Sequence, residues 1–176
     1  MVQFLLTVGA DVSRGDGNNQ NALFWAVLGC KKLLKKSTTV TQDNYENVIR
    51  YLLPRCDETT LNAKGSGEQT LGVTPLYFAV KNGLPNIVNL LADHPKTLLN
   101  CEVDITETVK RETGRPDIPK HFKETPLIRA LRDKRYDIAD ILIDASLHHQ
   151  YFMLFRALRK NTEIIPHYLY FYENLT

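Results

Sequence analysis

Cysteine is scarce in this sequence of 176 residues, and the few cysteines form no recognisable site. Cys30, Cys56 and Cys101 lie far apart, are odd in number and include no C-x-x-C pair. This spacing argues against a disulfide framework and against a structural zinc site. A reducing compartment is the natural expectation, and we therefore predict a cytoplasmic protein.

Long apolar runs and a large net charge are missing as well. No stretch approaches the roughly eighteen apolar residues that a membrane-spanning helix needs, and the N-terminus has no basic leader, so no membrane is expected as a partner. The formal net charge is only +2, which is too small for a general nucleic-acid footprint. Any positive patch must therefore be local.

The sequence contains no familiar catalytic motif. A P-loop, a dinucleotide fingerprint, a G-x-S-x-G elbow and an H-E-x-x-H pair are all absent. His148 and His149 are adjacent, so on a helix they would point in different directions and would not share a metal ion. Cys56 follows Arg55, whose charge would lower a thiol pKa, but no base can be assigned to it. We predict no catalysis, no cofactor and no metal.

The most informative stretch is GVTPLYFAVKNGLPNIVNLL, residues 72–91. Thr74 is suited to cap a helix that Pro75 begins, and Gly83 tolerates the left-handed conformation that ends it. Pro85 then opens a second helix whose aliphatic residues form one apolar stripe. The stretch predicts a helical hairpin that is too small to bury its own apolar faces and therefore needs neighbours.

The residues TPLYFA, then Asn82-Gly83, then Ile87-Val88 and Leu90-Leu91, make this stretch resemble the ankyrin repeat. One departure is Tyr77, where the family prefers histidine. The resemblance implies that this change removes a side chain that ties neighbouring repeats together by hydrogen bonds.

Weaker copies of the same pattern cover the rest of the chain. Val2 to Val12 matches the end of a repeat, and its missing first helix favours a fragment of a longer protein over an abbreviated cap. NALFWA and TPLIRA repeat the first-helix motif, whereas MLFRA, at residues 153–157, is a degenerate fifth copy. We place His148 and His149 in the loop before it. The expected repeats span about 1–15 (partial), 16–64, 69–101, 121–146 and 148–176, with insertions at about 30–44 and 101–123.

The expected fold is thus a single all-α domain over residues 1–176. The resemblance implies an ankyrin-repeat solenoid of about four to five irregular stacked hairpins, with short or extended β-hairpin fingers. The aromatic end of the chain, Tyr168 to Tyr172, is unusual for a terminal repeat, and it implies more chain beyond, a fold-back cap or a partner. Packing against the fourth copy is the alternative, and it explains only part of these side chains.

The resemblance implies a non-catalytic module that binds a protein on its concave face. Carried over position by position, the exposed slots include Val73 and Glu124. Two arginine pairs spaced by three residues are expected to form one cluster beside an aromatic half, although nearby aspartates would neutralise solvated arginines. For Trp25 and Phe78 the alternative is a place in the core between repeats, because the resemblance implies that this slot is often apolar. The predicted partner-binding residues are Trp25, Phe78, Lys81, Asn82, Arg129, Arg132, Arg156, Arg159 and Lys160.

An acidic or phosphorylated peptide segment is the expected ligand, because arginine forks bind carboxylates and phosphates. We expect a monomer. The irregular repeats resemble ankyrin effectors that intracellular bacterial pathogens or large viruses send into the host cytosol. Two alternatives are a regulatory or substrate-docking arm of a larger enzyme, and nucleic-acid binding with a steep dependence on salt.

Overall fold

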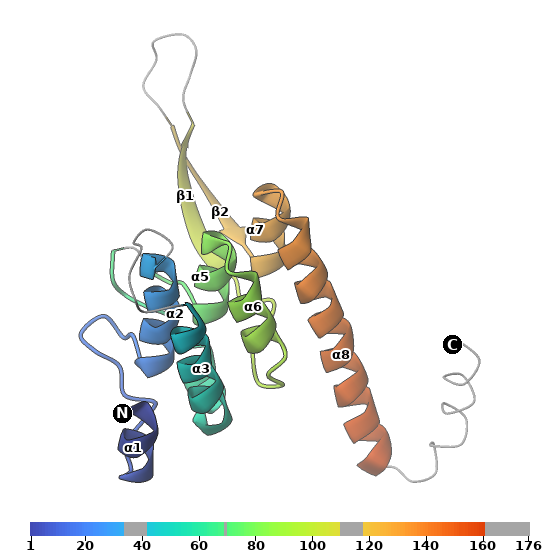
Figure 1. The fold of residues 1–176 in the computed structure, drawn as a ribbon. Coiled ribbons are helices and arrows are strands. Elements are labelled where there is room, and N and C mark those ends of the chain that lie inside the picture. Colours follow the sequence, from blue (N-terminus) through green and yellow to red (C-terminus); the bar gives the residue numbers. More distant parts are fainter. Residues whose placement is uncertain (34–41, 69, 110–117, 161–176) are drawn as a thin grey trace.

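The computed structural model describes residues 1–33, 42–68, 70–109 and 118–160, and these residues are mostly helical. Figure 1 shows the elements along the chain. In order they are α1 (Val2–Thr7), α2 (Ala22–Leu33), α3 (Gln42–Leu52), the 3-10 helix η1 (Leu53–Arg55), α4 (Glu58–Leu61), α5 (Pro75–Asn82), α6 (Pro85–Ala92), β1 (Val103–Val109), β2 (Ile118–Glu124), α7 (Pro126–Arg132) and α8 (Tyr136–Lys160).

The hairpin predicted for residues 72–91 is confirmed as α5 and α6. The Thr74 side chain caps α5 by accepting a hydrogen bond from the Tyr77 backbone N–H at 3.2 Å, and Pro75 is the first helical residue. Gly83 ends the helix with φ +66°, in the left-handed region that only glycine enters without strain. Local sequence alone therefore defines both ends of α5.

A side-chain cap also begins each of the two neighbouring first helices. Thr125 caps α7 by accepting from the Ile128 N–H at 3.3 Å, again with proline following. In α2, which lacks the Thr-Pro start, the Asn21 side chain takes over and accepts from the Phe24 N–H at 2.9 Å. The Asn21 amide also donates to the Thr60 carbonyl at 2.7 Å, so this cap anchors the α4 segment as well.

Three helical hairpins lie side by side within the described residues: α2 with α3, α5 with α6, and α7 with α8. The first helices α2, α5 and α7 contact one another in chain order, and so do the second helices α3, α6 and α8. One continuous apolar core runs through all three hairpins. No hairpin buries its apolar faces alone, as expected from its size.

The loops at the base of the hairpins are also tied to one another. The Asn62 amide donates to the Lys96 carbonyl at 2.9 Å, and its carbonyl accepts from the Leu98 N–H at 2.8 Å. Gln20 donates to the Thr70 hydroxyl at 2.7 Å in a buried contact. Each loop therefore receives polar partners from the loop of the next hairpin.

The 101–123 insertion contains an antiparallel β-hairpin that projects from the helices (Figure 1). Its register pairs Val103 with Glu124 at the base and Val109 with Ile118 at the outer end. Val103 is buried, which fixes the base of the hairpin in the core. This element matches the extended finger that the fold class anticipated.

One expectation about the chain after α7 was wrong. A loop before a fifth copy was placed around His148 and His149, but α8 is a single helix of 25 residues that runs through both histidines to Lys160. The segment ASLHHQ contains neither glycine nor proline, so nothing in it ends a helix. Residues 161–176, which were expected to complete that copy, lie outside the described residues.

Candidate protein-interaction face

The candidate site lies on the side chains of the three first helices. Trp25, in α2, is half-exposed and donates its indole N–H to Asp16 at 3.1 Å. Phe78 holds the equivalent position in α5 but is buried, which agrees with the core alternative and not with its expected role in partner binding. The Phe24 ring packs against it with centroids 5.8 Å apart, and the Lys31 ammonium lies 5.2 Å from its ring centroid.

Lys81 is exposed as predicted, and it lies in a locally cationic environment. Partial burial lowers its pKa, and the charges of Arg129 and Lys31 lower it further, against an opposing effect of Glu124 and Asp133. These cations come from three successive first helices. Asn82, next to Lys81, is half-buried and donates its amide to the Phe78 carbonyl at 2.7 Å, so it serves the helix end.

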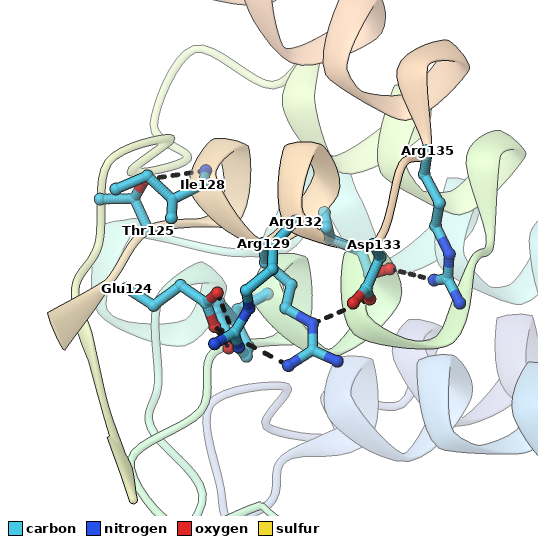
Figure 2. A network of polar contacts seen from close by, with 9 residues as sticks. Glu124, Thr125, Ile128, Arg129, Arg132, Asp133 and Arg135 are labelled. Carbon is cyan, nitrogen blue, oxygen red and sulfur yellow. Dashed lines mark hydrogen bonds and ion pairs between the residues drawn. The ribbon is translucent and has the colours of Figure 1, made fainter. Parts of the chain in front are cut away.

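Glu124 is the centre of a buried polar network beneath this surface (Figure 2). Its carboxylate is fully buried, and its oxygens lie 2.9 and 3.1 Å from an Arg132 guanidinium nitrogen. Arg129 approaches the same carboxylate at 3.8 Å and binds Asp133 at 2.9 Å. The Tyr77 hydroxyl donates to Glu124 from the preceding hairpin. A buried carboxylate is thus matched by two guanidinium groups and a phenol, as a buried charge requires.

The structure corrects three sequence expectations. Glu124 and Val73 were expected on the exposed face, but both are buried. Tyr77 was expected to weaken the link between neighbouring hairpins, yet its hydroxyl makes that link. Burial, and then the hydrogen bond to Glu124, raise the pKa of Tyr77, so the phenol keeps the proton that it donates.

The structure describes the side chains of only two arginines of the predicted four-arginine cluster. Arg129 and Arg132 do share one side of α7, but both bind Glu124. Arg129 also forms an ion pair with Asp133. Arg132 also stacks on Phe122, with its guanidinium carbon 4.9 Å from the ring centroid. Arg156, Arg159 and Lys160 belong to α8, and their side chains lie outside the described part of the structure.

A further tie that sequence reasoning missed comes from Arg135. Its guanidinium donates to the Val80 carbonyl at 2.6 Å and so satisfies the C-terminal end of α5 from the next hairpin. The sequence contained a hint of these contacts, because Glu124 is followed by arginines five and eight positions later and by Arg135 at the end of the turn.

We name Lys31, Lys81, Arg129 and Arg132 the basic face.

Two of the three cysteines, Cys30 and Cys56, are buried and are poor nucleophiles. Burial raises the pKa of both Cys30 and Cys56 to about 11, with a neighbouring carboxylate adding to the effect in each case. The expected influence of Arg55 on Cys56 was therefore wrong, because loss of hydration dominates. At pH 8 only about one thousandth of such a thiol is ionised, since each pKa step of one changes the ratio tenfold.

Thiol labelling is expected to follow this order. In the native protein at pH 8, iodoacetamide should modify Cys101, which is half-buried, well before Cys30 or Cys56. Peptide mass spectrometry at timed quenches measures each site, and denatured protein, in which all three should react alike, is the control. Native labelling of Cys56 as fast as Cys101 would contradict the buried thiol.

Among the described residues, no helix combines the length and the apolar character that a membrane crossing demands. Over the same residues, no three His, Cys, Asp or Glu side chains come together as metal ligands. Comparison with protein-family models, with curated proteins and with solved structures found no match for this chain.

Proposed function

We propose that this chain is a non-catalytic protein-interaction module of the ankyrin type, which binds an acidic or phosphorylated segment of a partner protein on its basic face. The ordered rows of first and second helices, and the loops bonded to one another, support a solenoid of stacked hairpins. In such a stack, successive first helices present one continuous surface.

The observation that carries the proposal is the meeting of cations from three helices. Lys81 of α5 lies close enough to Lys31 of α2 and to Arg129 of α7 for both charges to lower its pKa, although each residue belongs to a different hairpin. Glu124 and Asp133 offset part of the repulsion between these cations, and an anionic segment of a partner would offset the rest. Half-exposed Trp25 on α2 supplies an aromatic anchor of the kind that enriches binding hot spots.

The experiment that tests this is affinity capture with charge-reversal variants. Arg129 and Arg132 are poor targets because they hold Glu124, so the informative variant is Lys31→Glu with Lys81→Glu. Partners that the unmodified chain retains from a eukaryotic lysate should be lost by this variant. A matched control is Arg14→Glu with Lys96→Glu, which reverses two exposed charges on loops, and circular dichroism should show equal helix content in all three.

Retention of the same partners by the Lys31→Glu, Lys81→Glu variant would contradict the assignment of the basic face. The salt dependence of binding gives a second check. An acidic or phosphorylated segment held by these cations should bind more weakly as ionic strength rises, because the charges are exposed enough to be screened.

A further inference from the structure

The three hairpins differ in what covers the same positions of their first helices. Each first-helix motif ends in an alanine, which is residue 26, 79 or 130. The residues two before and one after this alanine are fully buried in α2, as Phe24 and Val27, and in α5, as Tyr77 and Val80. In α7 the equivalent residues are Ile128 and Leu131, whose side chains are 50% and 47% exposed. The next hairpin covers these positions in α2 and α5, whereas no described residue covers them in α7.

The second helix of this hairpin shows the same contrast. Ala92 of α6 is fully buried, whereas the equivalent residue of α8, Ile143, is 43% exposed, and Leu147 one turn later is 45% exposed. Asp140 and Asp144 flank these two residues and are also exposed. We name Ile128, Leu131, Ile143 and Leu147 the end face.

We propose that residues 164–172 of this same chain dock on the end face and cover it as the next layer of the stack. These residues follow α8 and lie outside the described residues. Their sequence, IIPHYLYFY, is almost entirely apolar or aromatic. Aliphatic side chains on the face match aromatic and aliphatic side chains in the segment, and tyrosine hydroxyls supply donors for the flanking carboxylates of Asp140 and Asp144.

The connection is long enough for this return. From Leu147 to Lys160, α8 extends about 20 Å at 1.5 Å per residue. Residues 161–168 span up to about 27 Å when extended, so Tyr168 reaches the level of Leu147. The short tether also gives the segment a high effective concentration at the end face, which favours it over a second copy of the chain at ordinary protein concentrations.

Site-specific photo-cross-linking of the full chain tests the proposal. A benzoylphenylalanine in place of Leu131, which is 47% exposed, should form a cross-link within one chain to a residue of 161–176, located by peptide mass spectrometry. The same group in place of Leu71, another exposed leucine in a distant loop, is the control and should not reach that segment.

A second variant separates docking from chance contact. Phe171→Asp in the Leu131 cross-linking chain should lower the yield at least about tenfold, because burial of one phenylalanine outweighs a factor of ten in an equilibrium constant. Cross-links that join two chains would assign the end face to a second copy and overturn the proposal. Absence of any cross-link from position 131, or a yield that Phe171→Asp leaves unchanged, would overturn it equally.

Discussion

Glu124→Gln is expected to lower the free energy of unfolding by about 3–5 kcal/mol, because it leaves two guanidinium groups without their buried carboxylate. The substitution preserves shape, so loss of packing does not account for the result. Arg132 now has two carboxylate oxygens at 2.9 and 3.1 Å, and glutamine would leave it one neutral acceptor and one N–H group that repels it, while the Tyr77 hydroxyl loses its charged acceptor. Urea denaturation followed by circular dichroism measures the change.

The matched control for this substitution is Glu102→Gln. Glu102 also pairs with a cation, Lys123, at 3.0 Å, but both side chains are more than half exposed. Removal of an exposed ion pair should leave the unfolding midpoint essentially unchanged. If Glu124→Gln and Glu102→Gln proved equally mild, the buried network would contribute little to stability.

Leu76→Ala is expected to destabilise the protein by about 2–5 kcal/mol, as a large buried side chain in a tight core does when truncated. Leu76 is 2% exposed and lies in the central hairpin, between α2 and α7. Because the three hairpins share one core, they should unfold together in a single transition at a lower temperature. Calorimetry combined with hydrogen exchange measures both properties.

A control of the same chemistry is Leu71→Ala, at a leucine that is 70% exposed and should change stability by no more than about 0.5 kcal/mol. Independent melting of the α5–α6 hairpin in the Leu76→Ala variant, with α2 and α3 still protected from exchange, would contradict a shared core.

Local features of the fold could be predicted from the sequence wherever the backbone chemistry is decisive. The Thr-Pro starts at residues 74 and 125 and the glycine at 83 define helix ends by hydrogen bonding and dihedral preference alone. The long α8 follows the same local rule, but the prediction missed it because it followed the repeat pattern instead. The repeat pattern suggested a break near His148, but the local sequence contains no residue that breaks a helix, and local propensity prevailed.

The candidate site was harder to predict because it depends on contacts between hairpins. Phe78 occupies a position that would be exposed on an isolated helix, but Phe24 and Lys31 from another helix cover it. Tyr77 and Glu124 are distant in sequence, and only the placement of α5 beside β2 and α7 makes them partners. Periodicity reports which face of a helix is apolar, but it does not report what the neighbouring hairpin places against that face.

The network that Glu124 forms with Tyr77, Arg129 and Arg132 also constrains how this sequence can diverge. Replacement of Tyr77, Arg129 or Arg132 alone leaves a buried carboxylate short of partners, and replacement of Glu124 alone takes the buried carboxylate away from both arginines. A path of single substitutions out of this arrangement therefore passes through an unstable intermediate. Descendants of this chain should keep the four residues as a set or exchange them together, whereas an exposed residue outside the network, such as Lys81, can vary alone.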